Sequence, residues 1–350
     1  PSYVPNSYYP NAEHREAGKA AKADLSDLDK KVAIMFTGRV NDPVVAEELI
    51  KGGYCDLVGM VRAGIADPEF AIKAREGRLN EIRRCIACTR CIDEASESLY
   101  IPYTPVCSIN PVIGNELRWE KEYKPATRPK RVVVVGGGLA GCEAARIAAQ
   151  RGHKVSLLEQ GKRLGGQLLI ASKAPGRDSF EDQVYFEENE MKRTGVDVRL
   201  ESRADIAAIR ALKPDAVVIA TGAVPRVPHD VSGLDQPHVV YGWDVMQGKA
   251  QTGKRVAIVS QEDYYETPGV ADYLASKGKE VTVFLKGAHI GKEIARYSVG
   301  MTLARMESLG VTTVPNVTLT KIDAKGLEFD SAFGGKTYRY EGFDTVVLVY

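Results

Sequence analysis

The sequence predicts an α/β protein in which parallel-sheet units flank a cysteine-rich segment, and three patterns lead to this prediction. Apolar runs alternate with helical patterns before residue 79. Three cysteines then recur at every third position, as Cys85, Cys88 and Cys91. From residue 130 the chain twice repeats a buried strand, a helix and a second strand, the βαβ pattern of a parallel sheet. We therefore expect βα units, a metal-binding segment and a Rossmann-like module, in that order.

Length and composition limit the domain number, the partners and the redox environment that we expect. A chain of 350 residues has room for two or three domains, and a net charge of +1 gives no reason to expect nucleic acid as a partner. No apolar run approaches the ~20 residues of a membrane span, and no basic-then-apolar leader opens the chain, so we expect no membrane. Six cysteines are too few for a disulfide scaffold, which favours a reducing cytoplasm. The chain starts at Pro1 and ends in "DTVVLVY", and we expect a piece of a longer protein.

The segment before the cysteines reads as two βα units. The apolar run "VAIMF" leads to Gly38-Arg39, a helix follows with Asp42 as its N-cap, and the second run "DLVGMVR" contains Gly59 and ends at Arg62. Glycine allows backbone amides to approach a phosphate, and arginine offers it a bidentate charged fork. Such pairs after the late strands of a TIM barrel hold a phosphate. A surface arginine after a strand is the competing interpretation.

The cysteine spacing is typical of an iron–sulfur site. In "RRCIACTRC" the thiols of Cys85, Cys88 and Cys91 can converge on one compact object, and Cys107 offers a fourth ligand from a distance. Bacterial ferredoxin-type loops bind a 4Fe-4S cluster with this C-x2-C-x2-C pattern. Structural zinc usually has two separated C-x2-C pairs, which fits less well but stays open as an alternative. Cys55 and Cys142 lie in apolar contexts, and we interpret both as packing residues.

The strongest nucleotide-binding signal spans residues 130–159. A buried strand runs into Gly136, Gly138 and Gly141, a helix follows, and the next strand ends at Glu159. The glycines allow a tight turn and close approach of a diphosphate to the helix N-terminus, and the glutamate can bind a ribose. "RLGGQL" and the strand ending in "ATG" add two further sites of close backbone approach. The predicted nucleotide-binding residues are Gly136, Gly138, Leu139, Ala140, Gly141, Glu159, Gln160, Arg163, Gly165, Gly166, Gln167, Thr221 and Gly222.

A second βαβ outline over residues 254–284 lacks this fingerprint. Ser260, Glu262 and Tyr265 stand where the first unit has its three glycines. Glu262 and Asp263 would also put negative charge where a diphosphate should lie, and one like-charge contact costs about 1 to 4 kcal/mol. We therefore expect that the second unit does not hold NAD(P)H through a fingerprint turn.

Taken together, the order of these motifs resembles the iron–sulfur flavoenzymes related to old yellow enzyme, which include 2,4-dienoyl-CoA reductase and trimethylamine dehydrogenase. The resemblance rests on "TGR", "GMVR", "NEIRRCIACTRC", "VVVVGGGLAGCEAA" and "RLGGQL". The two-residue gap between Cys88 and Cys91 and the degraded second turn are similar to the trimethylamine and histamine dehydrogenase branch. The fifteen-residue gap to Cys107 is longer than the eleven or twelve usual in the family.

The resemblance implies FMN, a 4Fe-4S cluster, and ADP or FAD as cofactors. It assigns the FMN phosphate to the residues Gly38, Arg39, Gly59, Met60, Val61 and Arg62, and the cluster to Cys85, Cys88, Cys91 and Cys107. It also implies that the catalytic residues lie upstream of Pro1, so none is named. The expected domains are the last TIM-barrel units at 1–78, the cluster segment at 79–125, an ADP/FAD domain at 126–249 and 324–350, and a degenerate NAD-type fold inserted at 250–323.

Three functions remain open from the sequence. The first is an N-demethylating amine dehydrogenase that passes electrons from FMN through the cluster to an electron-transferring flavoprotein. The second is an NAD(P)H-dependent reductase of alkenes such as enoates. The third is a non-catalytic, zinc-stapled nucleotide-binding module. For the enzymes we expect a small-molecule substrate and a homo-oligomer.

Overall fold

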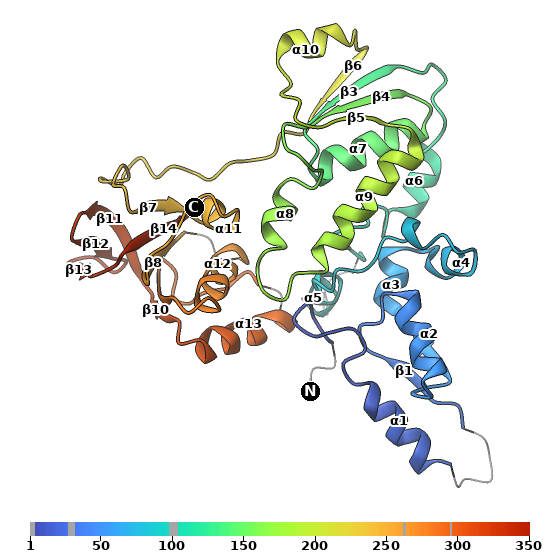
Figure 1. The fold of residues 1–350 in the computed structure, drawn as a ribbon, viewed down its shortest axis with the longest axis horizontal. Helices are drawn as coiled ribbons and strands as arrows, with labels where there is room; N and C mark the ends of the chain where they lie inside the picture. Colours follow the sequence, from blue (N-terminus) through green and yellow to red (C-terminus); the bar gives the residue numbers. More distant parts are fainter. Residues whose placement is uncertain (1–3, 27–31, 98–103, 262–263, 295) are drawn as a thin grey trace. The chain divides into compact units, whose positions relative to one another are not determined.

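The structure is a computed structural model that describes residues 4–26, 32–97, 104–261, 264–294 and 296–350 (Figure 1). The chain forms two compact units, one of Pro1–Leu169 and Gly176–Gly222, the other of Ile170–Pro175 and Ala223–Tyr350. Within the described part of the chain, no helix has both the length and the apolar character needed to cross a membrane.

The first unit begins with two short βα elements. Strands β1 and β2 pair in parallel, with Thr37 opposite Gly59. Asp42 caps the following helix by accepting a hydrogen bond from the Val44 amide at 2.9 Å. Two parallel strands are consistent with the predicted TIM barrel but are too few to show one, so the barrel stays a prediction. The elements are α1 (Arg15–Asp24), β1 (Met35–Thr37), α2 (Pro43–Lys51), β2 (Leu57–Gly59), α3 (Val61–Ala66) and α4 (Phe70–Arg75).

The cysteine-containing segment follows with little regular structure. Ile86 and Ile109 from this segment are buried against Ala66 of α3, and Phe180 packs on the same cluster. This small apolar core fixes the cysteine loops to the preceding and following elements. The regular elements here are η1 (Leu79–Glu81), α5 (Arg90–Glu97) and α6 (Glu116–Glu122).

A four-stranded parallel sheet completes the first unit. Its strand order is β5-β4-β3-β6, which is the 3-2-1-4 order of a Rossmann fold. Helices α7 and α9 cover one face, where Cys142, Ala145 and Met191 meet the strands, and α10 covers the other (Figure 1). The elements are β3 (Arg131–Val135), α7 (Leu139–Gln150), β4 (Lys154–Leu158), α8 (Gln167–Ala171), α9 (Phe180–Thr194), β5 (Asp197–Arg199), α10 (Ile206–Ala211) and β6 (Ala216–Ile219).

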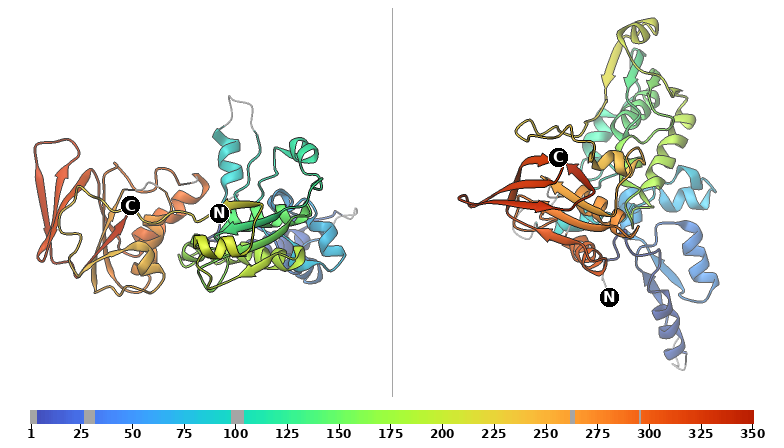
Figure 2. Two further views of the ribbon diagram at one scale, coloured as in Figure 1. Left: turned by 90° about the horizontal axis from the view of Figure 1, so that it is seen from above. Right: turned by 60° about the vertical axis from the view of Figure 1, so that its left-hand side comes forward.

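The second unit has three layers. Its central parallel sheet, of order β10-β9-β8-β14-β7, is packed on one face by helices and on the other by an antiparallel sheet of β11, β12 and β13 (Figure 2). Stacked Phe284 and Phe329, with ring centroids 4.5 Å apart, join the two sheets. The elements are β7 (Val239–Tyr241), α11 (Gly242–Met246), β8 (Arg255–Ser260), α12 (Glu266–Ala275), β9 (Glu280–Leu285), α13 (Arg296–Ser308), β10 (Thr312–Val314), β11 (Val317–Asp323), β12 (Gly326–Ser331), β13 (Thr337–Glu341) and β14 (Thr345–Val349).

The predicted α/β class with parallel sheets and a Rossmann-like fold is confirmed, but one strand lies elsewhere than expected. We expected residues 324–350 to return to the first nucleotide-binding fold. Strand β14 instead pairs in parallel with β8 and β7 in the second sheet, and β11 to β13 pack against that same sheet. The reason is topological, because β14 takes in the second 3-2-1-4 order the place that β6 takes in the first.

The place of β14 can be tested through Leu348, which is 1% exposed in the core of the second unit. We expect Leu348→Ala to lower the stability of this unit by about 2–5 kcal/mol, because it leaves a cavity in a packed core. Trp243 in the second unit and Trp119 in the first serve as separate fluorescent reporters, each in a background in which the other is phenylalanine.

Urea titration should move the Trp243 transition to lower denaturant and leave the Trp119 transition in place. Phe333→Ala, at an exposed turn of the same unit, is the matched control and should move neither. An equal shift of both tryptophan transitions by Leu348→Ala would contradict this assignment of β14.

Candidate functional site

Four cysteines from two separate loops line one pocket in the first unit. Cys85 and Cys88 come from the loop before α5, Cys91 lies in the first turn of α5, and Cys107 comes from the segment after that helix. Arg62 lines the same pocket. We call this site the four-cysteine pocket; the structure thus brings together the four residues that the sequence indicated as metal ligands.

The backbone of the three-cysteine loop is wound tightly enough to point its thiols to one side. Ala87 and Thr89 have φ values of 54° and 64°, the left-handed region that non-glycine residues rarely adopt. Each such residue costs on the order of 1 kcal/mol and is found mainly where function demands the conformation. The Ala87 amide donates to the Cys85 sulfur at 3.4 Å, and the Cys88 sulfur shares a hydrogen bond with the Ser108 hydroxyl at 3.3 Å.

Burial makes these thiols poor acids without a metal. It raises the pKa of Cys85 and of Cys91 to about 11, and it also raises the pKa of Cys107. The nearby Arg62 guanidinium opposes this effect and lowers the pKa of Cys85 and Cys91. At neutral pH the thiols of Cys85, Cys91 and Cys107 are therefore protonated, and a bound metal would hold them as thiolates.

Zinc and an iron–sulfur cluster place different demands on the four thiols. Within the described ranges, no three His, Cys, Asp or Glu side chains lie close enough together to hold one metal ion. A single tetrahedral zinc with Zn–S bonds of about 2.3 Å would need sulfurs about 3.8 Å apart. An iron–sulfur cluster is larger, so its ligands stand further apart around a common pocket. All four cysteines are free thiols.

The two predicted glycine–arginine pairs lie at the ends of neighbouring strands. Gly38 has a φ of 146° and Arg39 a φ of 48°, directly after β1. The Arg39 and Arg62 guanidinium groups donate to the carbonyls of Ser7 at 3.0 Å and Pro5 at 2.8 Å. Arg39 Nε is buried without a partner, and burial, together with the charge of Arg62, lowers the Arg39 pKa.

Two neighbouring cations with an unpartnered buried N–H form a site that an anion would complete, and a phosphate suits it. Gly59 ends β2, Met60 precedes α3, and Val61 begins that helix with an exposed side chain. The residues predicted for the FMN phosphate therefore fit such a group.

Direct contacts join this arginine site to the four-cysteine pocket. The Asn41 side-chain amide, two residues after Arg39, donates to the Cys85 carbonyl at 2.5 Å. Asp42 forms an ion pair with Arg84 at 3.0 Å. Sequence reasoning missed Asn41, because a single asparagine after a strand has no signal beyond that of a turn residue.

The first nucleotide turn is built so that side chains cannot replace two of its three fingerprint glycines. A Cβ on Gly136 would lie 2.3 Å from the Ala220 carbonyl oxygen, and a Cβ on Gly141 would lie 1.9 Å from that of Gly136. Gly138 begins helix α7 and faces open space, with nothing within 4 Å of where its Cβ would be. An open space at a helix N-terminus is where a diphosphate binds in such turns.

Glu159 ties the turn to its surroundings. Its carboxylate accepts the Gly137 amide at 2.6 Å and the Gly161 amide at 2.5 Å. Each carboxylate oxygen keeps a further lone pair that can accept from a ribose hydroxyl. The glutamate therefore orders the turn and remains available to a ligand.

The "RLGGQL" segment lies against the same turn. The Gly165 amide donates to the Gly137 carbonyl at 2.8 Å, and a Cβ on Gly166 would lie 3.0 Å from the Gly138 Cα. A Cβ on Gly222, which follows Thr221, would lie 3.4 Å from the Gln167 side-chain amide. The glycine turn at 136–141, the "RLGGQL" segment and the loop at Thr221-Gly222 thus lie against one another.

Not every predicted nucleotide-binding side chain turns toward this place. Arg163 forms ion pairs with Glu188 at 3.1 Å and Glu181 at 3.2 Å on helix α9. Gln160 is exposed, while Leu139 and Ala140 form the first turn of α7.

The second fold has a filled turn. The Ser260 and Thr267 hydroxyls share a hydrogen bond of 2.6 Å and are both buried. Tyr264 and Tyr265 contact each other edge to face, with ring centroids 4.7 Å apart. Glu262 and Asp263 lie outside the described residues, so the prediction of charge repulsion there rests on the sequence.

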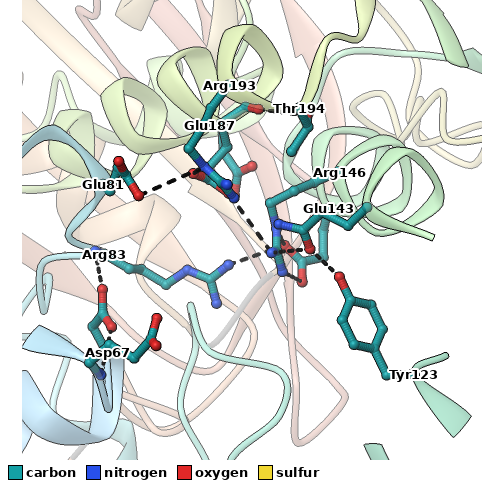
Figure 3. A network of polar contacts seen from close by, with 12 residues as sticks. Asp67, Glu81, Arg83, Tyr123, Glu143, Arg146, Glu187, Arg193 and Thr194 are labelled. Atoms are coloured by element: carbon teal, nitrogen blue, oxygen red, sulfur yellow. Dashed lines mark hydrogen bonds and ion pairs between the residues drawn. The ribbon is translucent and has the colours of Figure 1, made fainter. Parts of the chain in front are cut away.

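A buried network of charged side chains links the cysteine segment to α7 and α9 (Figure 3). Arg83 donates to Glu143 at 3.2 Å, and Glu143 is paired with Arg146 at 2.6 Å. On α9, Gln183 donates to Glu187 at 2.7 Å. The sequence did not reveal this network, because the polar run "EENEMKR" reads as a solvent-exposed helix face.

Comparisons with known proteins agree with this geometry. A family model described as pyridine nucleotide-disulphide oxidoreductase matches residues 130–349. The N,N-dimethylglycine/sarcosine dehydrogenase of Chromohalobacter salexigens is 38% identical over 80% of this chain and 40% of its own length. The NADH oxidase of Thermoanaerobacter brockii is 37% identical over 87% of this chain and 47% of its own length.

The solved structure of a 2-naphthoyl-CoA reductase with 2-naphthoyl-CoA matches with a TM-score of 0.89 and 31% identity, over 98% of this chain and 50% of that chain. The chain thus spans about half the length of the relatives that it matches.

The open space at Gly138 supports a direct test of the nucleotide site. We expect Gly138→Val to fold normally, since nothing lies within 4 Å of its Cβ, yet to lose bound ADP or FAD because the side chain occupies the place of the diphosphate. Glu159→Ala should weaken nucleotide binding about 12- to 150-fold, the equivalent of about 1.5–3 kcal/mol.

The measurements are nucleotide content after purification and calorimetric titration with ADP. Gly300→Val, at another helical glycine with open space, is the matched control and should keep wild-type affinity. Full nucleotide occupancy in Gly138→Val would show that the phosphate turn lies elsewhere.

Proposed function

The chain belongs to the pyridine nucleotide-disulphide oxidoreductase family, and on this premise we propose that the protein is an FMN- and 4Fe-4S-dependent oxidoreductase acting on amines. Its reaction is the two-electron oxidation of a secondary or tertiary N-methylamine, after which water adds to the oxidised amine and the methyl carbon leaves as formaldehyde. The electrons leave through the four-cysteine pocket to an electron-transferring flavoprotein.

The residues have distinct roles in this proposal. Arg39 and Arg62 bind the FMN phosphate, and the four cysteines hold the cluster as thiolates. Asn41 holds the Cys85 carbonyl and so keeps the two cofactor sites next to each other. When bound, the flavin accepts an electron pair from the amine and the cluster takes up electrons one at a time. The fingerprint turn and Glu159 hold ADP or FAD.

The filled turn of the second fold is the observation that favours an amine, rather than NAD(P)H, as the electron source. An NAD(P)H-dependent reductase needs a second turn open enough to accept the diphosphate of the nicotinamide cofactor. Here the buried Ser260–Thr267 pair occupies the start of that turn, where the first fold has a glycine. One additional like-charge contact from Glu262 or Asp263, of about 2 kcal/mol, would weaken binding about thirtyfold.

Two comparisons favour a second candidate function. The NADH oxidase and the 2-naphthoyl-CoA reductase that resemble this chain are both named for reactions other than amine oxidation. The second candidate is therefore an NAD(P)H-dependent reductase of conjugated alkenes that uses the same cofactors. The zinc-stapled binding module has weaker support, since the C-x2-C-x2-C spacing fits structural zinc less well than a cluster.

Anaerobic mixing of the intact holoenzyme with different reductants distinguishes the two enzyme functions. We expect the flavin absorbance to persist in excess NADH or NADPH and to bleach rapidly with a secondary or tertiary methylamine. Dithionite is the control that shows the flavin to be reducible. Flavin reduction by either pyridine nucleotide within turnover time would reject the amine dehydrogenase and support the alkene reductase.

A further inference from the structure

Glu187 is the one carboxylate of the buried network that has no cation of its own among the described residues. Glu143 is paired with Arg146 at 2.6 Å, and Glu190 with Arg193 at 2.6 Å. Among the described residues, Glu187, on helix α9, accepts a hydrogen bond only from the side-chain amide of Gln183, at 2.7 Å. It is 2% exposed, so solvent cannot replace the missing cation.

The hydrogen bonding around Glu187 has a gap that one proton would close. Glu187 Oε2 and Gln183 Oε1 are both buried and both lack a partner. An ionised carboxylate and an amide oxygen are acceptors only, so they cannot bond to each other. A proton on Oε2 makes it a donor, and Gln183 can then donate to one oxygen of Glu187 and accept from the other.

Burial, together with the charge of Glu143 and against the opposing charges of Arg83 and Arg146, raises the pKa of Glu187 to about 7. A small change in the local electrostatic potential therefore changes the fraction of Glu187 that is protonated near neutral pH. The charged and titratable groups that face it come from the cysteine segment, from α7 and from its own helix: Arg83, Cys142, Glu143, Arg146 and Glu190.

Arg83 connects this glutamate to the four-cysteine pocket. It lies two residues before Cys85, is 7% exposed, and its guanidinium stacks 4.6 Å from the centroid of the Phe186 ring. The same guanidinium acts on both sides, since its charge favours the ionised form of Cys107 and of Glu187. Its Nε atom has no partner. The buried Arg83 guanidinium thus stabilises negative charge both in the pocket and on Glu187.

We propose that Glu187 is the proton-binding residue coupled to electron uptake at the four-cysteine pocket. With a cluster bound there, one electron from the amine substrate, passed on by the flavin, would add one negative charge to the pocket, and one proton from bulk water would bind Oε2 of Glu187, so that the buried region would keep its net charge. The coupling rests on the proposed function, because it requires a redox group in that pocket. Glu187 does not touch the reacting substrate and acts as a charge-compensating residue.

The sign of the pH dependence follows from this coupling. Added negative charge in the pocket raises the affinity of Glu187 for a proton, so the reduced protein binds the proton up to a higher pH than the oxidised protein. The reduction potential should then be constant at acid pH and fall as the pH rises through neutrality. In this window the ratio of reduced to oxidised protein at a fixed electrode potential should fall by up to tenfold per pH unit.

The first experiment is a potentiometric titration of the cluster in the holoenzyme, followed by electron paramagnetic resonance at several pH values. Glu187→Gln keeps the shape of the protonated side chain and can bond to Gln183 through both groups. We expect it to hold the acid-limit potential of the wild type at all pH values. Glu120→Gln, at an exposed residue of α6, is the matched control and should titrate like the wild type.

The second experiment begins with the wild type, so its first result does not depend on a substitution being tolerated. Infrared difference spectra of the wild type, reduced minus oxidised, should show a protonated carboxyl C=O band that shifts in deuterium oxide. The band should be absent in Glu187→Gln and present in Glu120→Gln.

A cluster-containing protein with a pH-independent potential and no carboxyl band would overturn the role of Glu187 and leave the proposed function intact. A band that persists in Glu187→Gln would assign the proton to another residue and would equally overturn the proposal. Protein without iron would overturn the proposed function and this coupling together, and iron is measured on the same sample.

Discussion

The convergence of four partly buried thiols on one pocket is the constraint on which the rest of the first unit depends. Ala87 and Thr89 adopt left-handed backbone conformations between the cysteines, and burial raises the pKa of Cys85 and Cys91 to about 11. A bound metal would convert these thiols into thiolate ligands. The strained loop, the partly buried sulfurs and the adjoining arginine site are all consistent with the proposed cluster and FMN sites.

Each neighbouring site is attached to this pocket by a specific contact. Asn41 joins the Cys85 carbonyl to the loop that carries Arg39. On the other side, Arg83 reaches helix α7 through Glu143, and α7 begins at the nucleotide turn. The predicted FMN, cluster and nucleotide sites are therefore connected through short chains of hydrogen bonds and ion pairs. This arrangement explains how a charge change in the pocket can be felt at Glu187.

The sequence was informative where chemistry demands particular residues at fixed spacing, and uninformative where packing decides. Cysteine spacing and the glycine turn indicated residues that the structure does bring together. Strand β14 was assigned to the wrong sheet, because "VVLV" is a buried strand in either sheet and only pairing distinguishes them. Arg163 was predicted to bind the nucleotide but forms ion pairs with Glu181 and Glu188 of α9. Glu187 was missed, because a polar helix segment buried between two helices has the composition of an exposed one.

The most direct test of the four-cysteine pocket is the metal and sulfide content of protein prepared without oxygen. We predict about four iron and about four acid-labile sulfide per chain, with visible absorbance in addition to that of flavin. Cys107→Ala should reduce this to an incomplete, labile cluster, whereas Cys55→Ala, a buried cysteine outside the pocket, should retain full iron. One equivalent of zinc without sulfide, or full iron in Cys107→Ala, would contradict the account.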